Sequence, residues 1–358
     1  MSQSASKRSS FGKFGLGIVL VFGLLAMSLG EGHSKEALIK RSQYLMGTLV
    51  VVTGVAPDEE TAKNAVAAGL AEIRRIEQLM STWIPTSELS RVNAAAGKHP
   101  VSVSPENMEV LKASLRMATL TEGGFNIAVG PAVEAWNVSQ EGRIPSQEEL
   151  DAVRPFISLA NVRLDEQAGT VYLKLAGMQI DVGGIGKGYA ADLVVAVMQQ
   201  AGATAGVVAL SGDIKTFGRM PDQKRFVFGI QHPRKEQGVI LGRIELENEA
   251  VSTAGDYQRF IMKDGIRYHH ILNPATLQPA RECQSVTVIA KDGVMADGLD
   301  TGIFVMGPEK GMALIESLSD VEGVIVDQQG KIYISSGLQS RLMLISEASA
   351  DKNSGDKE

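Results

Sequence analysis

Residues 180–189 read Ile-Asp-Val-Gly-Gly-Ile-Gly-Lys-Gly-Tyr, and this stretch is the strongest indication of the fold. The apolar run at 178–182 predicts a strand, the glycines predict a tight turn, and residues 188–201 predict a helix. Backbone N–H groups at a helix start that glycine leaves accessible form an anion site, for which phosphate is a natural ligand. A tight connection without a ligand is the alternative, because neither GxxxxGK[ST] nor GxGxxG is matched.

Three more helices are expected around this stretch. Pro57 opens the first, and a second begins at Ser104 and Pro105 and ends at 123–124. The third begins near Val294 and ends before Gly307. One face of the first helix is apolar: Ala62, Val66, Leu70, Ile73, Ile76 and Met80.

Strands are expected at 44–53, 171–175, 178–182, 206–210, 226–231, 239–247 and 285–290. Residues 239–247 alternate apolar and charged side chains, which is the period of a half-buried antiparallel strand. Helices and strands mix without strict alternation along the chain. The sequence therefore predicts an α+β fold with antiparallel-rich mixed sheets and packed helices.

Composition limits the classes of partner. The 358 residues are 44% hydrophobic and 21% charged, with a formal net charge of −6. This composition is typical of a globular protein, and it lacks the basic footprint of a nucleic-acid-binding domain. No nucleic acid is therefore expected as a partner.

The N-terminus predicts export. Residues 1–30 hold Lys7, Arg8 and Lys13 before an apolar run at 14–27, which is the layout of a signal peptide or of an uncleaved N-terminal anchor. The single cysteine is Cys283, so no lipoprotein cysteine follows the apolar run and no internal disulfide can form. Both interpretations place residues 31–346 outside the cytoplasm, as one domain or as two subdomains. Residues 347–358 are small, polar and charged and predict a solvated tail.

Residues 296–301 form a second polar cluster, Ala-Asp-Gly-Leu-Asp-Thr. On a helix surface, Asp297, Asp300 and Thr301 can present oxygens to one point, with Asp300 at the flank. Oxygen ligands without imidazole or thiolate suit a hard cation such as magnesium. A solvated helix face, or Asp297 acting only as a helix cap, is the alternative.

Residues 268–274 carry two adjacent histidines, His269 and His270. A histidine can accept a proton from a hydroxyl nucleophile at neutral pH. Neighbouring side chains on a strand point to opposite faces, so at most one of the two serves a site. A structural histidine is the alternative for either residue alone.

In their order along the chain, these segments resemble one family, the FAD:protein FMN transferases known as ApbE-like proteins. The resemblance runs from Tyr44 to about Gly307 and implies an ApbE-like, T-fold-related architecture. The matching segments are 46–48, 81–83, 87–93, 125–131 with Trp136, 181–192, 211–213, 252–257 with Arg259, 270–274 and 296–301.

The resemblance implies roles for individual residues. His270 matches the family's candidate base. Flavin-contacting positions fall at Met46, Trp83, Asn126, Asp181, Lys187 and Ile271. Magnesium positions fall at Asp297, Thr301 and the backbone carbonyl of Gly184. Asn126 stands where the family commonly has Asp, and Trp83 replaces a frequent Tyr and should still stack on a ring.

The implied reaction is magnesium-dependent transfer of FMN from FAD to a Ser or Thr hydroxyl of an acceptor protein, with release of AMP. FAD is then the substrate, and the acceptor is expected to be an extracytoplasmic part of a membrane redox complex. This agrees with a periplasmic protein or one anchored to the outer face of the inner membrane. Two alternatives remain open: an FAD pyrophosphatase that uses water as nucleophile, and a non-catalytic periplasmic flavin-binding protein.

Overall fold

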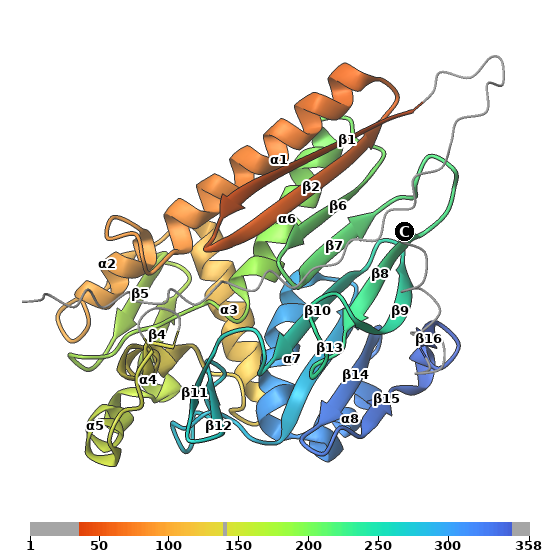
Figure 1. The fold of residues 1–358 in the computed structure, drawn as a ribbon. Coiled ribbons are helices and arrows are strands. Elements are labelled where there is room, and N and C mark those ends of the chain that lie inside the picture. Colours follow the sequence, from red (N-terminus) through yellow and green to blue (C-terminus); the bar gives the residue numbers. More distant parts are fainter. Residues whose placement is uncertain (1–35, 139–141, 346–358) are drawn as a thin grey trace, which may run out of the picture.

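The computed structural model describes residues 36–138 and 142–345 (Figure 1). The predicted signal segment at 1–30 and the predicted tail at 347–358 lie outside these residues. Among the described residues, no helix has both the length and the apolar character needed to span a bilayer.

Eight strands form the central sheet, and every neighbouring pair in it is antiparallel. Their order is β1 (Ala37–Leu45), β2 (Thr48–Ala56), β6 (Ala205–Leu210), β7 (Asp213–Phe217), β10 (Ala250–Gly255), β13 (Cys283–Ala290), β14 (Val321–Asp327) and β15 (Ile332–Ile334). The predicted α+β class with antiparallel-rich sheets is confirmed.

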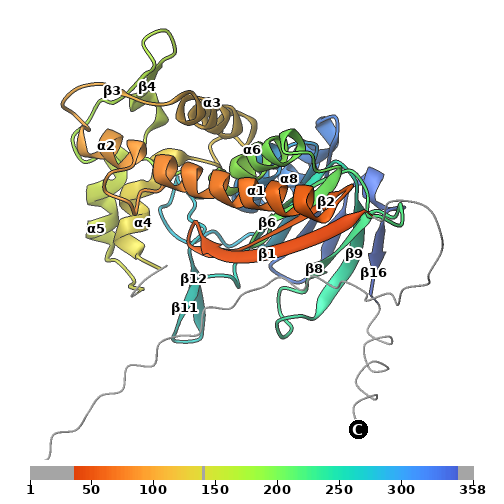
Figure 2. The ribbon, with the colours of Figure 1, turned by 90° about the horizontal axis from the view of Figure 1, so that it is seen from above.

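Both faces of this sheet are covered, which gives three layers. The helices on one face are α1 (Glu59–Met80), α6 (Gly186–Gln200), α7 (Gly293–Met306) and α8 (Pro308–Ser317), with α3 (Pro105–Leu120) packed on α7 (Figure 2). A smaller sheet covers the other face: β8 (Phe226–Gln231), β9 (Ile240–Leu246) and β16 (Leu342–Leu344). In β2, Val50 and Val52 therefore enter the helix-side core and Val51 and Val55 enter the opposite core.

The remaining elements surround one end of the helical layer (Figure 1). They are α2 (Glu88–Ala94), α4 (Gly130–Trp136), α5 (Gln147–Val153), the sheet of β3 (Val101–Ser102), β4 (Val162–Asp165) and β5 (Thr170–Leu173), and the hairpin of β11 (Phe260–Lys263) and β12 (Ile266–His269). Short 3-10 turns lie at Ile127–Val129, Arg154–Phe156, Leu159–Asn161 and Ser336–Leu338. Trp136 joins α4 to the segment after β12, because its indole N–H donates to the carbonyl of Leu277 at 2.8 Å.

The predicted helices are found, with small shifts at their ends. Asp58 caps α1 and accepts the N–H of Thr61, and all six predicted apolar residues of this helix are buried. Ser104 caps α3. Helix α6 begins at Gly186, two residues before the predicted start.

The prediction of one strand at 44–53 is wrong. Leu45 pairs with Thr48, so Met46 and Gly47 form a two-residue hairpin turn between β1 and β2. Their φ angles are 50° and 68°, as a type I′ turn requires at both central positions. Methionine is uncommon at positive φ, so a turn at Met46 and Gly47 is not evident from the residue types.

The predicted strand at 178–182 is also wrong, because its backbone is hydrogen-bonded elsewhere. Asn93 holds Ile180 from both sides: its side-chain oxygen accepts the Ile180 N–H at 2.8 Å, and its amide donates to the Ile180 carbonyl at 3.0 Å. The N–H of Asp181 donates to the carbonyl of Ile127. The segment is therefore an anchored loop that leads into α6.

Helices α6 and α7 approach each other at two glycines, Gly188 and Gly293. A Cβ added to Gly188 would lie 2.1 Å from the Gly293 carbonyl oxygen. We expect Gly188→Ala to lower the free energy of unfolding by about 3 kcal/mol, at the upper end of typical overpacking costs. Chemical denaturation measures the loss.

Gly186→Ala is the matched control in the same helix, because its Cβ would lie at an ordinary 3.5 Å from Val182. Equal stability of the two variants would contradict the close packing of α6 and α7.

Candidate active site

The glycine-rich turn at 183–185 leads directly into α6. The N-cap residue of α6 is Ile185, and its apolar side chain makes no capping hydrogen bond. Instead the carboxylate of Asp297, from α7, accepts the N–H of Gly188 at 2.8 Å. Asp297 therefore caps α6, and any phosphate at this turn would use the remaining amides.

Helix α7 is positioned by contacts at its own start. Asp192 of α6 accepts the N–H groups of Gly293 at 2.8 Å and Val294 at 2.9 Å. Lys215 of β7 lies 3.2 Å from the same carboxylate. These contacts, together with the close passage of Gly188 and Gly293, direct Asp297 toward the start of α6.

Three carboxylates gather beside this helix start. Asp213 at the start of β7 and Asp297 and Asp300 of α7 are all buried, and each places an oxygen within 4.8 Å of the others. Asp297 is only 2% exposed, so its predicted place on a helix surface is wrong. Helix α7 packs against α6, β7 and β10, and these elements enclose Asp297 and Asp300. Helical periodicity alone did not indicate this burial.

Ser252 of β10 connects two of the carboxylates. Its hydroxyl lies within hydrogen-bond distance of Asp213 and at 2.6 Å from Asp300. A hydroxyl has one proton to donate, so one of these two carboxyls must itself carry a proton. Burial, followed by the charges of Asp297 and Asp213, raises the pKa of Asp300 well above its usual range.

The other two charged groups of the cluster are strongly perturbed. Burial and the neighbouring Asp213 raise the pKa of Asp297 to about 7. Lys187 lies between Asp213 and Asp297, 3.7 Å from the latter. Burial opposes the charged form of Lys187, but the two carboxylates outweigh it and raise the pKa of the ammonium.

The cluster fits a divalent cation. With all groups ionised, three carboxylates and one ammonium leave two negative charges. Asp300 Oδ1 is buried and has no hydrogen-bond partner within 36–138 and 142–345. Carboxylate oxygens are ligands that magnesium prefers.

Two of the predicted magnesium positions lie together. Thr301 Oγ1 is 3.1 Å from the point that a Cβ on Gly184 would occupy, and Asp297 is one helical turn before Thr301. Sequence reasoning assigned no role to Asp213 and placed Asp300 at the flank. The sequence signal that could have identified Asp213 is the Ser-Gly-Asp segment at 211–213. In the structure this segment is the turn between β6 and β7, and Ser211 has a φ of 61°.

The two adjacent histidines have different environments. His269 is buried, and its Nε2 donates to the Ala280 carbonyl at 2.7 Å while its Nδ1 accepts the Ile271 N–H at 3.2 Å. Its ring also packs edge-on against Phe304. Both ring nitrogens are used, so His269 is a structural residue.

His270 has a nitrogen to offer. Its Nδ1 lies 3.3 Å from the carbonyl of Arg259, which leaves Nε2 as the proton-accepting nitrogen. Desolvation and the positive charge of Arg259 lower the pKa of His270 to about 3. The imidazole is therefore neutral at pH 7, the protonation state that a base requires. Its role as the catalytic base remains a prediction.

Two predicted flavin contacts, Met46 and Trp83, lie at the C-terminal end of α1. The N–H of Met46 donates to Glu77 of α1 at 2.7 Å. Trp83 follows α1 by three residues and is 63% exposed, so its ring face is open to a ligand. Their assignment as flavin contacts remains a prediction.

The other predicted flavin contacts lie around the glycine-rich turn. Asn126 accepts the N–H of Ala128 and donates to the Ile157 carbonyl, so it organises its own loop. Asp181 accepts the N–H of Gly183 at 2.6 Å, and burial raises the pKa of its carboxyl. Ile271 is 5% exposed and follows His270 directly. Lys187 lies in the acidic cluster, and the assignment of these four residues as flavin contacts remains a prediction.

The comparisons with known proteins agree with this arrangement. The sequence model of the ApbE family matches residues 46–325. FAD:protein FMN transferase of Klebsiella pneumoniae (strain 342) is 30% identical over 297 residues, covering 82% of this chain and 91% of that protein. The enzyme of the same name from Treponema pallidum (strain Nichols) is 30% identical over 350 residues, covering 91% and 95%.

Solved structures give the same result. The ApbE protein of Thermotoga maritima has a TM-score of 0.78 at 30% identity, covering 85% of this chain and 99% of that one. Flavin transferase ApbE from Vibrio cholerae has a TM-score of 0.76 at 30% identity, covering 86% and 99%.

The fold and the buried carboxylates at a glycine-rich helix start define an α+β enzyme with an oxygen-rich site. The chain belongs to the ApbE family, which confirms the family predicted from its motifs.

Proposed function

We propose that the protein is a magnesium-dependent FAD:protein FMN transferase that attaches FMN to a Ser or Thr hydroxyl of an acceptor protein and releases AMP. The observation that carries the proposal is the buried cluster of Asp213, Asp297 and Asp300 at the start of α6. When a cation displaces the shared proton, three carboxylates and one ammonium leave two negative charges that it can neutralise. The relatives that share the fold are named FAD:protein FMN transferases.

In this proposal the chain's own groups position the reaction. Asp297, Thr301 and the Gly184 carbonyl would hold magnesium, with Asp213 and Asp300 completing the acidic surroundings. Magnesium would supply positive charge that offsets the charge of the FAD pyrophosphate. The N–H groups of Gly183, Ile185 and Gly186 donate within the loop, so the Gly184 N–H would bind a phosphate oxygen. Trp83 would stack on a ring of FAD.

The chemical step exchanges one P–O bond for another. The acceptor hydroxyl oxygen bonds to the FMN phosphorus, the pyrophosphate P–O bond to AMP breaks, and the hydroxyl proton passes to Nε2 of His270. His270 is neutral at pH 7, and the negative charge of bound FAD would raise its lowered pKa toward the range in which a base is effective.

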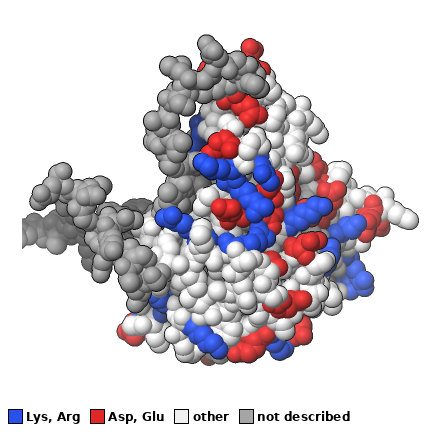
Figure 3. Space-filling model, turned by 90° about the vertical axis from the view of Figure 1, so that its right-hand side faces the viewer, with Lys and Arg blue, Asp and Glu red and all other residues white. Residues whose placement is uncertain are grey.

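We further propose that residues 31–346 act outside the cytoplasm, as one domain or as two subdomains, carried there by the segment at 1–30. The acceptor would be an extracytoplasmic part of a membrane redox complex. Nucleic acid is not part of the proposal, and on the face drawn in Figure 3 basic and acidic side chains are interspersed. Arg219 and Arg225 pair with Glu247 in this way.

One assay tests the reaction. The purified protein is incubated with FAD, magnesium and a peptide that carries an acceptor hydroxyl, and the peptide mass and free AMP are measured. We expect a mass gain of one FMN unit with stoichiometric AMP. AMP and free FMN without labelled peptide would indicate a pyrophosphatase, and bound FAD without AMP would indicate a flavin-binding protein.

Magnesium affinity is expected to depend on pH. Only the ionised carboxylate binds the metal, and the pKa of Asp297 is raised to about 7. Lowering the pH from 8 to 6 reduces the ionised fraction and should weaken magnesium binding about tenfold. Thermal shift measured against magnesium concentration at both pH values checks this, and an unchanged affinity would contradict the role of Asp297.

A further inference from the structure

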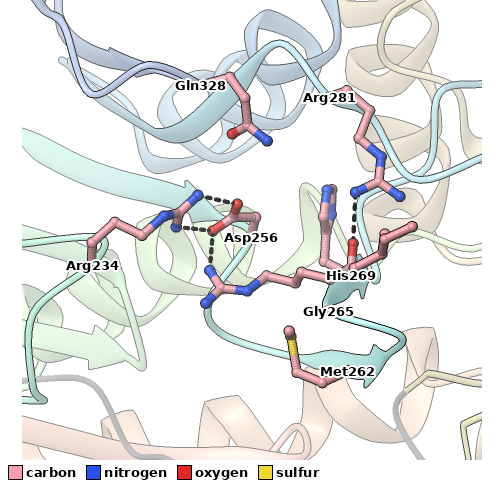
Figure 4. Close-up of a pocket in the computed structure, with 9 residues that line it drawn as sticks. Arg234, Asp256, Met262, Gly265, His269, Arg281 and Gln328 are labelled. Carbon is pink, nitrogen blue, oxygen red and sulfur yellow. Dashed lines mark hydrogen bonds and ion pairs between the residues drawn. The ribbon is translucent and has the colours of Figure 1, made fainter.

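A cavity lies on the β11–β12 hairpin, outside the acidic cluster. It has a volume of about 310 Å³, and Figure 4 shows the side chains that surround it. The polar side chains of its lining are Arg234, Asp256, Arg267, His269, Arg281 and Gln328. None of these residues has a role in the proposed transfer of FMN.

The cavity is positively charged. Asp256 is buried and binds Arg234 through two hydrogen bonds of 2.7 Å and Arg267 through one of 2.9 Å. Arg281 donates to the carbonyl of Arg267 at 2.7 Å and packs against the ring of Tyr268. Three guanidinium groups and one carboxylate leave a local charge of +2, in a chain whose formal net charge is −6.

Hydrogen-bond donors converge on the cavity. Arg281 donates one N–H to the backbone carbonyl of Arg267 and has no carboxylate partner among the residues the structure describes. The side-chain amide of Gln328 lies at the rim opposite His269 (Figure 4). Guanidinium forks of this kind match the two oxygens of a carboxylate, so the cavity has the chemistry of an oxyanion site.

The mouth of the cavity favours a polypeptide ligand. Met262 is 54% exposed and Ile266 is 45% exposed, and both line the cavity on the hairpin. Apolar side chains beside guanidinium groups suit a peptide with an acidic residue better than they suit inorganic phosphate.

The position of the cavity relative to His270 indicates which polypeptide the cavity binds. His269 lines the cavity and His270, the next residue, is the proposed base. A protein that presents its hydroxyl to His270 must pass close to the hairpin. Resting on the proposed function, we propose that this arginine pocket binds an acidic side chain of the acceptor protein and thereby positions the acceptor hydroxyl.

Two matched peptides test the proposal by direct binding, so the result does not depend on FMN transfer. One fluorescein-labelled peptide carries the acceptor hydroxyl flanked by Asp and Glu, and the other carries Asn and Gln instead. Fluorescence anisotropy with the full chain measures each dissociation constant. We expect the acidic peptide to bind about 10- to 100-fold more tightly, because charge-assisted hydrogen bonds to guanidinium are lost with the neutral peptide.

Variants of Arg281 locate the effect. Arg281→Gln should reduce the affinity for the acidic peptide to that for the neutral one, whereas Arg281→Lys should retain part of the preference. Arg163→Gln, an exposed site on β4, is the control and should change neither affinity. Folding of each variant is checked by its melting temperature.

Three results would overturn the proposal. Equal binding of the two peptides to the unaltered protein would do so without any variant. Wild-type binding of the acidic peptide by Arg281→Gln would place the contact elsewhere. Stabilisation by inorganic phosphate that Arg281→Gln abolishes, without binding of the acidic peptide, would assign the pocket to a free anion. Failure of FMN transfer alone would instead contradict the proposed function.

Discussion

Replacing His270 with alanine is expected to slow FMN transfer by about 10²- to 10⁴-fold, the usual contribution of a general base. FAD binding should change little, because the proposed role of His270 is to accept the hydroxyl proton. Single-turnover transfer to the acceptor peptide and a separate FAD titration distinguish the two effects.

His269→Ala is the matched control one residue away. Its two hydrogen bonds, to Ala280 and from Ile271, are structural, so this variant should lower the melting temperature more than His270→Ala does. If soluble, folded His270→Ala retains normal transfer while folded His269→Ala loses it, the assignment of the base is wrong.

The helices were predictable because their signals are local. The apolar spacing of 62–80 and the Ser-Pro pair at 104–105 each lie within the helix that they specify, so no distant contact is needed to recognise them. The strands at 206–210 and 285–290 were predictable for the same reason, since each is a short, largely apolar run that the sheet buries. The strand at 226–231 was predictable from its alternation, because Phe226, Phe228 and Ile230 are buried and the residues between them are more exposed.

The errors arose where distant contacts decide the structure. The 178–182 segment has the composition of a strand, but Asn93, almost ninety residues earlier, supplies its hydrogen-bond partners. Similarly, the spacing of Asp297, Asp300 and Thr301 correctly indicated a shared helix region but not its burial. Asp213 lies on β7, whereas Asp297 and Asp300 lie on α7. Only the order of strands in the sheet places β7 next to β10 and close to α7.

Asp297→Asn is expected to abolish magnesium-dependent transfer, with a loss of about 10³-fold or more, because a metal's charge contributes several kcal/mol to such a reaction. The asparagine side-chain oxygen can still accept the Gly188 N–H, so α6 stays capped and the fold is retained. Asp297→Ala is a poorer test, since it leaves the buried Gly188 N–H without its partner and costs about 1–3 kcal/mol of stability.

The same measurement on the neighbouring positions identifies the principal ligand. Asp300→Asn preserves the hydrogen bond with Ser252 and removes a carboxyl whose raised pKa already disfavours its charged form, so it should weaken magnesium binding less than Asp297→Asn does. Thr301→Ser keeps the hydroxyl and should be nearly silent. Turnover and thermal shift are measured against magnesium concentration for each variant. Wild-type magnesium dependence in Asp297→Asn, with loss in Asp300→Asn, would move the principal ligand to Asp300 and leave Asp297 as the cap of α6.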